Sequence, residues 1–244
     1  MISSFFDLRA VDVTASTNLD LKRLAKEGAR EGTVLLARRQ TAGRGRQGRV
    51  WESPEGNLYL SILLRPSCTV REAGVYSFIA SLAVFETVKA FARAAQVEIK
   101  WPNDVLVGGK KICGILLETN LTPDRKVDWL VLGVGINVLR HPEGLPYAAT
   151  SLAAEGAKTD PQTVLEVFLR HFEIWLHAYD EEGFAQIRSA WRARARTGRI
   201  TARLTDCEIV GEFMGVDEDG HLILRLDDGT EKAISAADVF FPEN

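Results

Sequence analysis

The segment Gln40–Trp51 concentrates residue types that bind anions. It reads Gln-Thr-Ala-Gly-Arg-Gly-Arg-Gln-Gly-Arg-Val-Trp, with its glycines and arginines alternating almost without interruption. Glycine lets backbone N–H groups converge on a ligand at close range, and arginine forks hold carboxylate or phosphate oxygens in pairs. No apolar side chain between Ala42 and Val50 is available for burial. We therefore expect this loop to be mobile until an anionic ligand orders it.

The glycines of this loop, Gly43, Gly45 and Gly48, formally match the dinucleotide-binding fingerprint G-x-G-x-x-G. That fingerprint requires a strand before it and a helix after it. Here Pro54 follows closely and excludes a helix of useful length, and Leu58–Leu64 then has the apolar composition of a buried strand. We set the dinucleotide fold aside, which leaves an anion cradle, a solvated basic turn or a nucleic-acid patch.

A second group of polar residues follows a predicted strand. Lys100–Asp104 reads Lys-Trp-Pro-Asn-Asp, and Pro102 fixes a turn that holds Asn103 and Asp104 at the strand's end. There an amide can bind a base or sugar edge, and a carboxylate can act on a proton or a cation. An ordinary Asx turn is the alternative interpretation.

Glycines also interrupt two apolar strands, where they would leave backbone uncovered for a ligand. Gly114 lies three residues after Lys111, and Gly133–Asn137 repeats the pattern with two glycines and a terminal asparagine, Asn137. A lysine that begins a strand often only extends to solvent. Together with the arginine loop, however, these residues describe a pocket floored by a sheet, for an elongated ligand that ends in an anion.

Composition limits the class of protein. The 244 residues, 46% of them hydrophobic, suffice for one or two domains with a sizeable core. The formal net charge of -3 argues against a nucleic acid as the main partner. Cys68, Cys113 and Cys207 are odd in number and far apart, and no histidine clusters with them, so neither disulfides nor a zinc site are predicted. A signal peptide and long apolar runs are missing, so we expect a cytoplasmic protein without membrane partners.

Hydrophobic periodicity predicts an α+β fold in which a mixed, mostly antiparallel sheet is backed by helices. Helices are expected at about 18–28, 73–95, 161–179 and 182–196, and Thr17 with Asp20 fits a capping box for the first. Strands are expected at 33–37, 58–64, 97–101, 105–107, 111–119 and 129–138, with a tight turn at Gly108 and Gly109. The arginines at 188, 192, 194 and 196 are interpreted as a solvated face.

The hydrophobic pattern of the sequence changes after Gly198. Short alternating strands at 200–204, 208–216, 221–226 and 230–235 predict a small β-barrel of roughly 45 residues, joined by acidic hairpin turns. We therefore expect a catalytic domain at 1–197 and a barrel at 198–244.

Five motifs, in their order and spacing, resemble those of the biotin protein ligases. They are Ser16–Asn18, Gln40–Trp51, Lys100–Asp104, Lys111–Glu118 and Gly133–Asn137. The resemblance spans residues 16–138, and the C-terminal barrel agrees in kind. It implies a class-II-synthetase-like catalytic domain followed by an SH3-like domain.

The resemblance also implies two half-reactions. The carboxylate of biotin attacks the α-phosphate of ATP to give biotinyl-5′-AMP and pyrophosphate, and a lysine amine of a biotin carboxyl carrier protein then displaces AMP. Mg²⁺ is expected to accompany ATP, held largely by phosphate and water, with no metal ligands assigned in the chain. Because two anions meet in the first step, fixed positive charge is its principal need.

Roles for individual residues follow from the same resemblance. Biotin is expected to contact Ser16, Thr17, Asn18, Gln40 and Gly114, and its carboxylate or acyl phosphate to contact Gly43, Arg44, Arg46 and Lys111. The nucleotide is expected near Arg44, Arg49, Trp51, Asn103 and Asn137, with Trp51 a candidate for stacking. The catalytic group comprises Arg46, Lys111 and Asp104, of which Asp104 orients or deprotonates the incoming lysine amine.

The chain departs from the family pattern in two respects. Members that double as repressors carry an N-terminal helix-turn-helix domain, for which there is no room before Ser16, so we expect a ligase without DNA binding. Gln47 stands where another arginine is common, so no role is assigned to it. Members are often homodimers through a sheet edge, although the sequence shows no self-complementary patch. A lipoate protein ligase of the same fold and a non-catalytic biotin sensor are the alternative functions.

Overall fold

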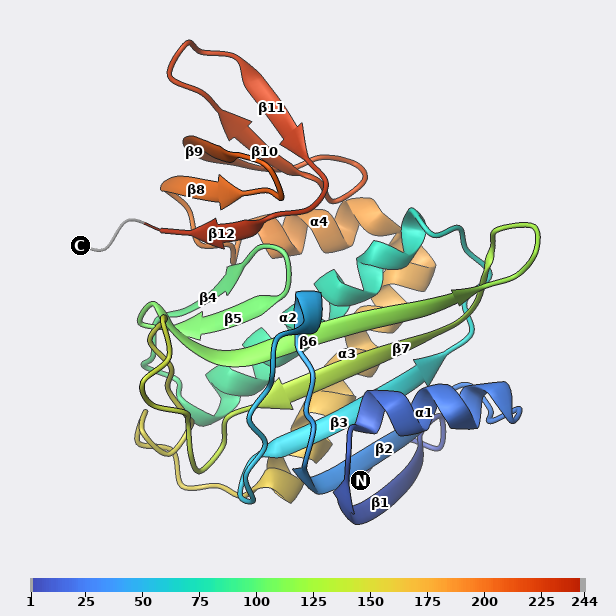
Figure 1. Ribbon diagram of the computed structural model, residues 1–244. Helices are drawn as coiled ribbons and strands as arrows, with labels where there is room; N and C mark the ends of the chain where they lie inside the picture. Colours follow the sequence, from blue (N-terminus) through green and yellow to red (C-terminus); the bar gives the residue numbers. More distant parts are fainter. Residues whose placement is uncertain (1, 242–244) are drawn as a thin grey trace.

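A large mixed sheet forms the centre of the molecule (Figure 1). The computed structural model describes residues 2–241; residues 1 and 242–244, at the outer ends of the two expected domains, lie outside the described residues. The strand order is β1-β2-β3-β7-β6-β5-β4, with β1 parallel to β2 and every other neighbouring pair antiparallel. The strands are β1 (Asp7–Thr14), β2 (Thr33–Gln40), β3 (Leu58–Leu64), β4 (Val97–Lys100), β5 (Asp104–Val107), β6 (Lys110–Leu121) and β7 (Val127–Ile136). The expected mixed, mostly antiparallel sheet is confirmed.

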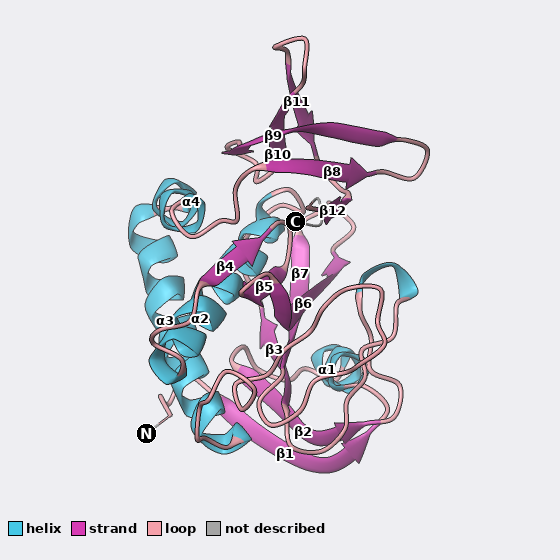
Figure 2. Cartoon of the chain, turned by 90° about the vertical axis from the view of Figure 1, so that its left-hand side faces the viewer, coloured by secondary structure: helices cyan, strands magenta, loops and turns pink. Residues whose placement is uncertain are grey.

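The two faces of this sheet carry different helices (Figure 2). The helices are α1 (Thr17–Lys26), α2 (Val75–Phe91), α3 (Pro161–Glu182) and α4 (Phe184–Arg192). Successive side chains of β3 point to opposite faces. Leu60 and Ile62 belong to the main core with α2 and α3. Leu63 instead packs with Leu21 and Ala25 of α1. Since α1 covers only part of its face, the rest is available to the arginine loop.

Helix α2 lies in the core. Residues Glu72–Phe91 have the length and apolar composition of a membrane span, but most of this stretch is buried inside the protein. Phe78 packs edge-on against Phe184 and Trp191, which makes the aromatic residues of α2 packing groups. The helix ends earlier than the expected residue 95, because Ala92 leaves helical geometry at φ -125 and ψ 65.

The C-terminal strands form a separate antiparallel sheet of order β11-β10-β9-β8-β12. They are β8 (Arg199–Arg203), β9 (Glu208–Val216), β10 (Leu222–Arg225), β11 (Glu231–Ile234) and β12 (Asp238–Phe240). Strand β12 was not expected, and among the described residues no ladder joins it to β11, so the barrel is open. The indole N–H of Trp101 donates to the carbonyl oxygen of Gly220 at 2.9 Å, which joins this sheet to the end of β4.

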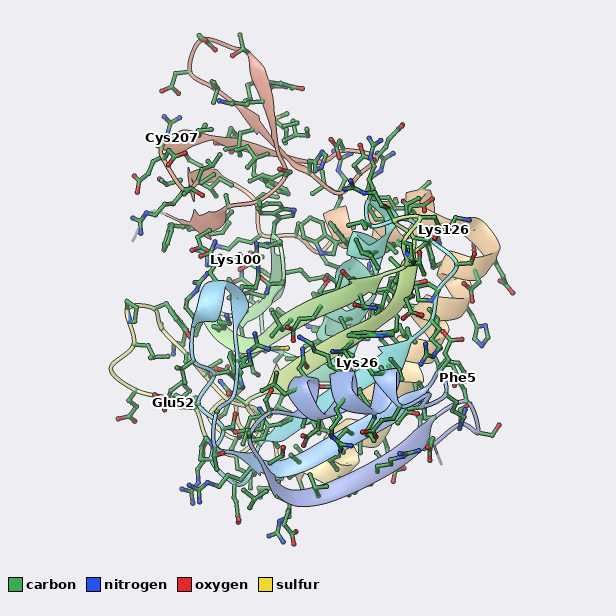
Figure 3. All side chains as sticks on the ribbon, turned by 45° about the vertical axis from the view of Figure 1, so that its right-hand side comes forward. Phe5, Lys26, Glu52, Lys100, Lys126 and Cys207 are labelled. Carbon is green, nitrogen blue, oxygen red and sulfur yellow. The ribbon has the colours of Figure 1, made fainter. Side chains whose placement is uncertain are left out.

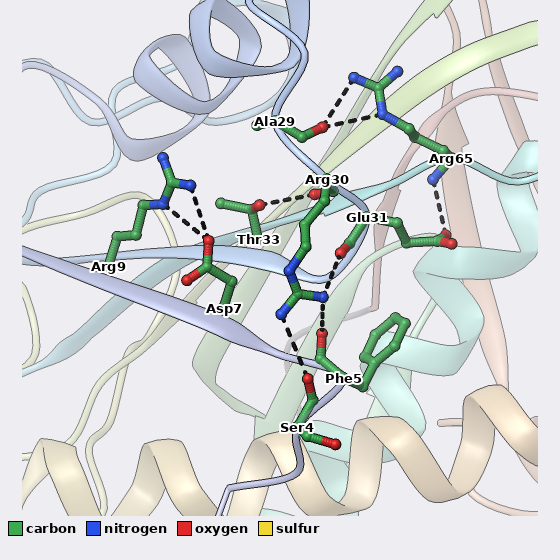
Figure 4. A network of polar contacts seen from close by, with 9 residues as sticks. All are labelled: Ser4, Phe5, Asp7, Arg9, Ala29, Arg30, Glu31, Thr33 and Arg65. Carbon is green, nitrogen blue, oxygen red and sulfur yellow. Dashed lines mark hydrogen bonds and ion pairs between the residues drawn. The ribbon is translucent and has the colours of Figure 1, made fainter.

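The first strand, β1, was also missed. Its central side chains are exposed at the edge of the sheet, so it lacks the alternation that marks a half-buried strand. The segment before it is fixed by polar contacts (Figure 4): the guanidinium of Arg30 donates to the carbonyl oxygens of Phe5 and Ser4, and the N–H of Arg65 donates to Glu31. Hydrogen bonds rather than apolar periodicity therefore place this strand.

The predicted capping box of α1 is wrong. Ser16 is the N-cap residue and makes no side-chain cap hydrogen bond. The carboxylate of Asp20 accepts from the hydroxyl of Thr14, whereas Thr17 is bonded to Gln40. The polar side chains at this helix start face the neighbouring strands and do not cap the helix.

The interpretation of the arginines at 188, 192, 194 and 196 as a solvated face is wrong for Arg194 and Arg196, whereas Arg192 is exposed. Arg194 pairs with Glu86 at 2.9 Å, and its guanidinium lies 5.3 Å from the ring of Phe85. Arg192 donates to the backbone oxygen of Met214, and the guanidinium of Arg196 lies 4.1 Å from the ring centre of Phe241. Helix α4 ends at Arg192, so Arg194 and Arg196 lie beyond it. Through these contacts Arg194 connects to α2, whereas Arg192 and Arg196 connect to the C-terminal region.

Candidate active site

A strip without side chains runs along the α1 face of the larger sheet. Gly114 of β6 pairs directly with Gly135 of β7, and Gly133 points to the same face two residues earlier. A Cβ atom at Gly135 would lie 2.5 Å from Nε1 of Trp51, and one at Gly114 would lie 2.9 Å from a carbon of the same ring. This glycine strip therefore creates room for a flat group against the backbone, and the indole of Trp51 fills it.

Buried hydroxyl and amide groups close the end of the glycine strip beside α1. The hydroxyl of Ser61 in β3 lies within hydrogen-bond distance of the Thr17 hydroxyl, at 2.7 Å, and of Oδ1 of Asn18, at 2.6 Å. Oε1 of Gln40 accepts from the backbone N–H of Thr17 at 2.8 Å. Ser16 is buried as well. Such a cluster of fixed donors and acceptors suits a small polar ring.

Glu118 of β6 connects the glycine strip to the arginine loop. Its carboxylate accepts from Asn18 at 3.0 Å and forms ion pairs with Lys22 at 2.9 Å and Arg44 at 3.1 Å. Burial alone would raise the pKa of Glu118, but hydrogen bonds from Lys22 and Asn18 and the nearby charges hold that pKa below its ordinary value. Glu118 is therefore an anion that holds Arg44 at the rim of the site.

The arginine loop folds back on itself above the glycine strip. Arg44 forms an isolated antiparallel bridge with the returning segment, and Arg46–Gly48 makes a 3-10 turn. The backbone N–H of Trp51 donates to the carbonyl oxygen of Gly43 at 3.0 Å. A Cβ atom at Gly43 would collide with the carbonyl oxygen of Trp51, so the close approach of the two segments requires glycine there.

The ammonium group of Lys111 lies between two aromatic rings at the open end of the glycine strip. Its Nζ is 5.5 Å from the ring centre of Trp51 and 5.4 Å from that of Tyr147. It also forms an ion pair of 2.6 Å with Asp104. Both rings are within cation–π range, so the ammonium is held at a defined point.

A second lysine faces the other carboxylate oxygen of Asp104. Nζ of Lys100 lies 3.8 Å from Oδ2, at the place where the larger sheet meets the C-terminal sheet (Figure 3). Burial lowers the pKa of Lys100, although the charge of Asp104 opposes this shift. Asp104 reaches this position because it begins β5 directly opposite Gly114. One carboxylate thus lies between two ammonium groups beside the glycine strip.

The remaining loop arginines reach across to other elements. Nη1 of Arg46 lies 3.4 Å from Oδ1 of Asn103, and burial lowers the pKa of Arg46. The amide of Asn103 donates to the backbone oxygen of Ile115, which leaves Oδ1 free to accept from Arg46. Arg49 forms an ion pair of 2.6 Å with Asp238 of β12. The loop is therefore connected to both sheets.

An open cavity of about 120 Å³ lies beside Lys111. Its lining consists of Val50, Trp51, Glu52, Lys111, Asn137, Pro142, Leu145, Tyr147 and Ala149. The backbone of Lys111 donates to Ala148 at 2.8 Å and accepts from Thr150 at 2.9 Å, which fixes this wall. The buried amide of Asn137 donates to the carbonyl oxygen of Thr150 at 2.9 Å. Asn137 is thus an anchor of the wall as well as part of the lining.

The structure places all the expected site residues in one continuous region. The closed end holds Ser16, Thr17, Asn18 and Gln40; the middle holds Gly43, Arg44 and Gly114; and the open end holds Arg46, Trp51, Asn103, Asp104, Lys111 and Asn137. Arg49 lies at the margin, facing the C-terminal sheet.

Sequence reasoning assigned no role to Ser61, Glu118 or Tyr147. Ser61 could have been found, because it is a small polar residue within the buried strand Leu58–Leu64. Glu118 ends the apolar part of β6 and is detectable only through its partners on α1 and the loop. Tyr147 lies in an irregular segment and carries no signal.

Models of known families match both parts of the chain. Residues 10–137 match the Biotin/lipoate A/B protein ligase family, and residues 199–241 match the Biotin protein ligase C terminal domain. The biotin--[acetyl-CoA-carboxylase] ligase of Paracoccus denitrificans is 40% identical over 237 residues, which cover 93% of this chain and 98% of that protein. The bifunctional ligase/repressor BirA of Bacillus subtilis is 38% identical over 92% of this chain and 71% of its own length.

Solved structures agree with these matches. The biotin protein ligase from Aquifex aeolicus in complex with biotin and ATP superposes with a TM-score of 0.80 at 30% identity, over 96% of this chain and 97% of that chain. The biotin protein ligase from Leishmania major in complex with biotinyl-5-AMP gives a TM-score of 0.63 at 27% identity, over 94% and 99%. Fold, site geometry and sequence therefore lead to one assignment: the chain belongs to the Biotin/lipoate A/B protein ligase family, as a biotin protein ligase.

Proposed function

We propose that this chain activates biotin with ATP and transfers it to a lysine of a biotin carboxyl carrier protein. The observation that carries the proposal is the order of groups along the glycine strip. Buried hydroxyl and amide groups lie at one end, and Lys111 and Arg46 lie at the other. This order suits a ligand with a polar ring, a flexible chain and a terminal carboxylate, and the relatives' names and ligands support biotin and ATP.

In the first half-reaction a carboxylate oxygen of biotin attacks the α-phosphorus of ATP, and the bond to pyrophosphate breaks. Two anions must approach each other, so cations fixed in advance reduce the barrier. Lys111 and Arg46 supply those charges from the sheet and from the loop. The indole of Trp51 occupies the glycine strip, so biotin displaces it, and the freed ring is then available to stack on the adenine.

In the second half-reaction the lysine amine of the carrier attacks the acyl carbon, and AMP leaves. The amine has to lose a proton to become a nucleophile. Asp104 is the carboxylate beside the reacting end, where Lys111 and Lys100 hold its two oxygens. We assign it the role of orienting the amine and accepting its proton.

In this scheme Mg²⁺ binds together with ATP, the substrate of the enzyme. Near the open end, Asp104 and Asp238 each pair with a cationic side chain, and Glu52 of the cavity lining is an exposed single carboxylate. A possible metal-ligating group, Asp217, Asp219 and His221, lies in the turn between β9 and β10, where its members bond to one another and to Arg71. The donor set at the site thus suits an ion carried by the phosphates better than a resident one.

The wider organisation follows from this function. We propose that residues 1–197 form the catalytic domain and 198–244 an accessory domain, and that the enzyme works in the cytoplasm. We also propose that two copies of the chain pair as a homodimer, as the family resemblance implies. The exposed edge strand β1 offers a surface for pairing of two copies.

Two measurements test the proposal. Pyrophosphate release with ATP and Mg²⁺ should require biotin and should not occur with lipoate. The same mixture should then label a carrier protein at one lysine. Activation of lipoate instead would indicate the sister activity, and tight biotin binding without pyrophosphate release would indicate a sensor.

A further inference from the structure

We propose that Asp238, in the C-terminal sheet, is a positioning residue for the nucleotide site and acts through Arg49. The inference rests on the proposed ligase function and deepens it. It assigns a role to one residue of β12, a strand that follows all five motifs in the sequence and belongs to the accessory domain.

Hydrogen bonds hold the guanidinium of Arg49 on one side only. Its Nε donates to the backbone oxygen of Arg46 at 3.3 Å. Its Nη2 donates to Oε1 of Gln47 at 3.3 Å and to Oδ1 of Asp238 at 2.6 Å. Within residues 2–241 no hydrogen bond engages Nη1. The fork is therefore fixed through two nitrogens, while the third can donate to a phosphate oxygen.

The short contact to Asp238 dominates this arrangement. The side chain of Arg49 is 54% exposed and lies just after the 3-10 turn of the loop, whereas Asp238 is 24% exposed and belongs to a strand. An arginine without such an anchor would lose rotamer freedom on binding ATP, and that loss weakens binding. By taking Nη2 in advance, Asp238 reduces this cost.

A second residue of β12 faces the catalytic domain. Phe240 lies on the same side as Asp238, two residues along, while Val239 between them is buried in the C-terminal sheet. The ring of Phe240 lies 4.6 Å from the guanidinium of Arg203 and 5.9 Å from the ammonium of Lys100. One short strand thus contacts both the arginine loop and the lysine beside the catalytic carboxylate.

A carboxylate next to an arginine can also act in the opposite sense, by competing with phosphate for the same cation. The two roles predict opposite changes in the KM for ATP. A positioning residue raises the KM for ATP when it is removed, whereas a competitor lowers it. The free Nη1 favours positioning, because the phosphate does not need the nitrogen that Asp238 occupies.

The test compares Asp238→Asn with Asp227→Asn, a matched control in which Asp227 pairs with Arg199 at 2.8 Å in the same sheet. We expect Asp238→Asn to raise the KM for ATP about tenfold, with kcat and the KM for biotin within about twofold of wild type. The control should match wild type. Asp238→Glu, which keeps the charge, should recover most of the affinity.

A double-mutant cycle with Arg49→Gln identifies the route. If Asp238 acts through Arg49, Asp238→Asn should have little further effect once Arg49→Gln is present. Calorimetric titration of each variant with ATP compares the dissociation constants for ATP without turnover. This measurement tests the role of Asp238 even if the wild-type protein forms no adenylate and the proposed function fails. An unchanged or lower dissociation constant in Asp238→Asn, or full additivity with Arg49→Gln, would overturn the proposal.

Discussion

The glycine strip and the arginine loop serve one site but are held in place by different forces. The strip belongs to the β6–β7 ladder, and its closed end rests on Ser61, which is fully buried and hydrogen-bonded to α1. The loop is anchored at its surface by the ion pairs of Arg44 with Glu118 and of Arg49 with Asp238. Exposed ion pairs contribute about 0–1 kcal/mol, whereas a buried polar group left without its partner costs about 1–3 kcal/mol.

This difference teaches how the site divides its tasks. A ligand can replace the ion pair of Arg44 with its own anionic groups while Asp238 still holds Arg49, so the loop can follow the reaction. The sheet cannot rearrange without losing buried hydrogen bonds. We therefore expect changes at groups fixed by the sheet to have larger effects than changes at groups carried by the loop.

The largest effect should come from the lysine at the open end of the strip. Lys111→Ala removes a cation held by two rings and a carboxylate, so adenylate formation should slow by about 10²- to 10³-fold. Single-turnover pyrophosphate release measures this rate. Lys110→Ala, one residue earlier and exposed, is the control. A near-normal rate in Lys111→Ala would show that the charge of Lys111 does not assist adenylate formation.

Asp104→Ala tests whether the two half-reactions use different groups. Transfer to the carrier lysine should slow by about a hundredfold, because the amine loses its proton acceptor, while adenylate formation should stay within severalfold of wild type. Mixing preformed biotinyl-5′-AMP with enzyme and carrier isolates the second step. Equal losses in both steps would reject this division.

Gly135→Ala tests the shape of the strip. The new Cβ atom would lie 2.5 Å from Nε1 of Trp51, where both the indole and biotin need the space. Overpacking of this kind costs about 1–3 kcal/mol, so the KM for biotin should rise roughly tenfold or more. Gly74→Ala is the control, because its Cβ atom meets nothing within 4 Å. Unchanged biotin affinity would show that the ligand does not lie on Gly135.

The smallest effect should come from the loop. Arg46→Gly removes one charged contact, so the adenylate should dissociate about tenfold faster from the enzyme. Arg46→Lys keeps the positive charge at this position and serves as control. If both variants release the adenylate equally fast, the charge of Arg46 does not govern its retention. A loss as large as that of Lys111→Ala would contradict the contrast between strip and loop.

The sequence predicted the elements whose side chains alternate or repeat. Strands β3, β6 and β7 are strongly apolar, and both the helices and the acidic hairpin turns carry local signals. Strand β1 was missed because its exposed side chains carry no period, and β12 because it is three residues long. Local patterns record burial, and these edge strands are placed by hydrogen bonds to distant segments.

The same limit applies to the site. Motif spacing identified Lys111 and Asp104, but their ion pair depends on the register between β5 and β6. Neither Glu118 nor Asp238 could be assigned, since each acts through a partner more than seventy residues away in the chain. The failed capping box has the same origin, because Thr17 of α1 bonds to Gln40 of β2.

The position of Trp51 gives this enzyme a natural optical probe. Its Nε1 is buried and has no hydrogen-bond partner among the described residues, whereas Trp101 and Trp191 donate to Gly220 and Ser81. An indole that leaves the glycine surface for a different environment changes its emission wavelength and intensity, while Trp101, Trp129, Trp175 and Trp191 lie in other parts of the fold. The intrinsic fluorescence of the protein should therefore report biotin binding in real time, without a label attached to the enzyme or its substrate.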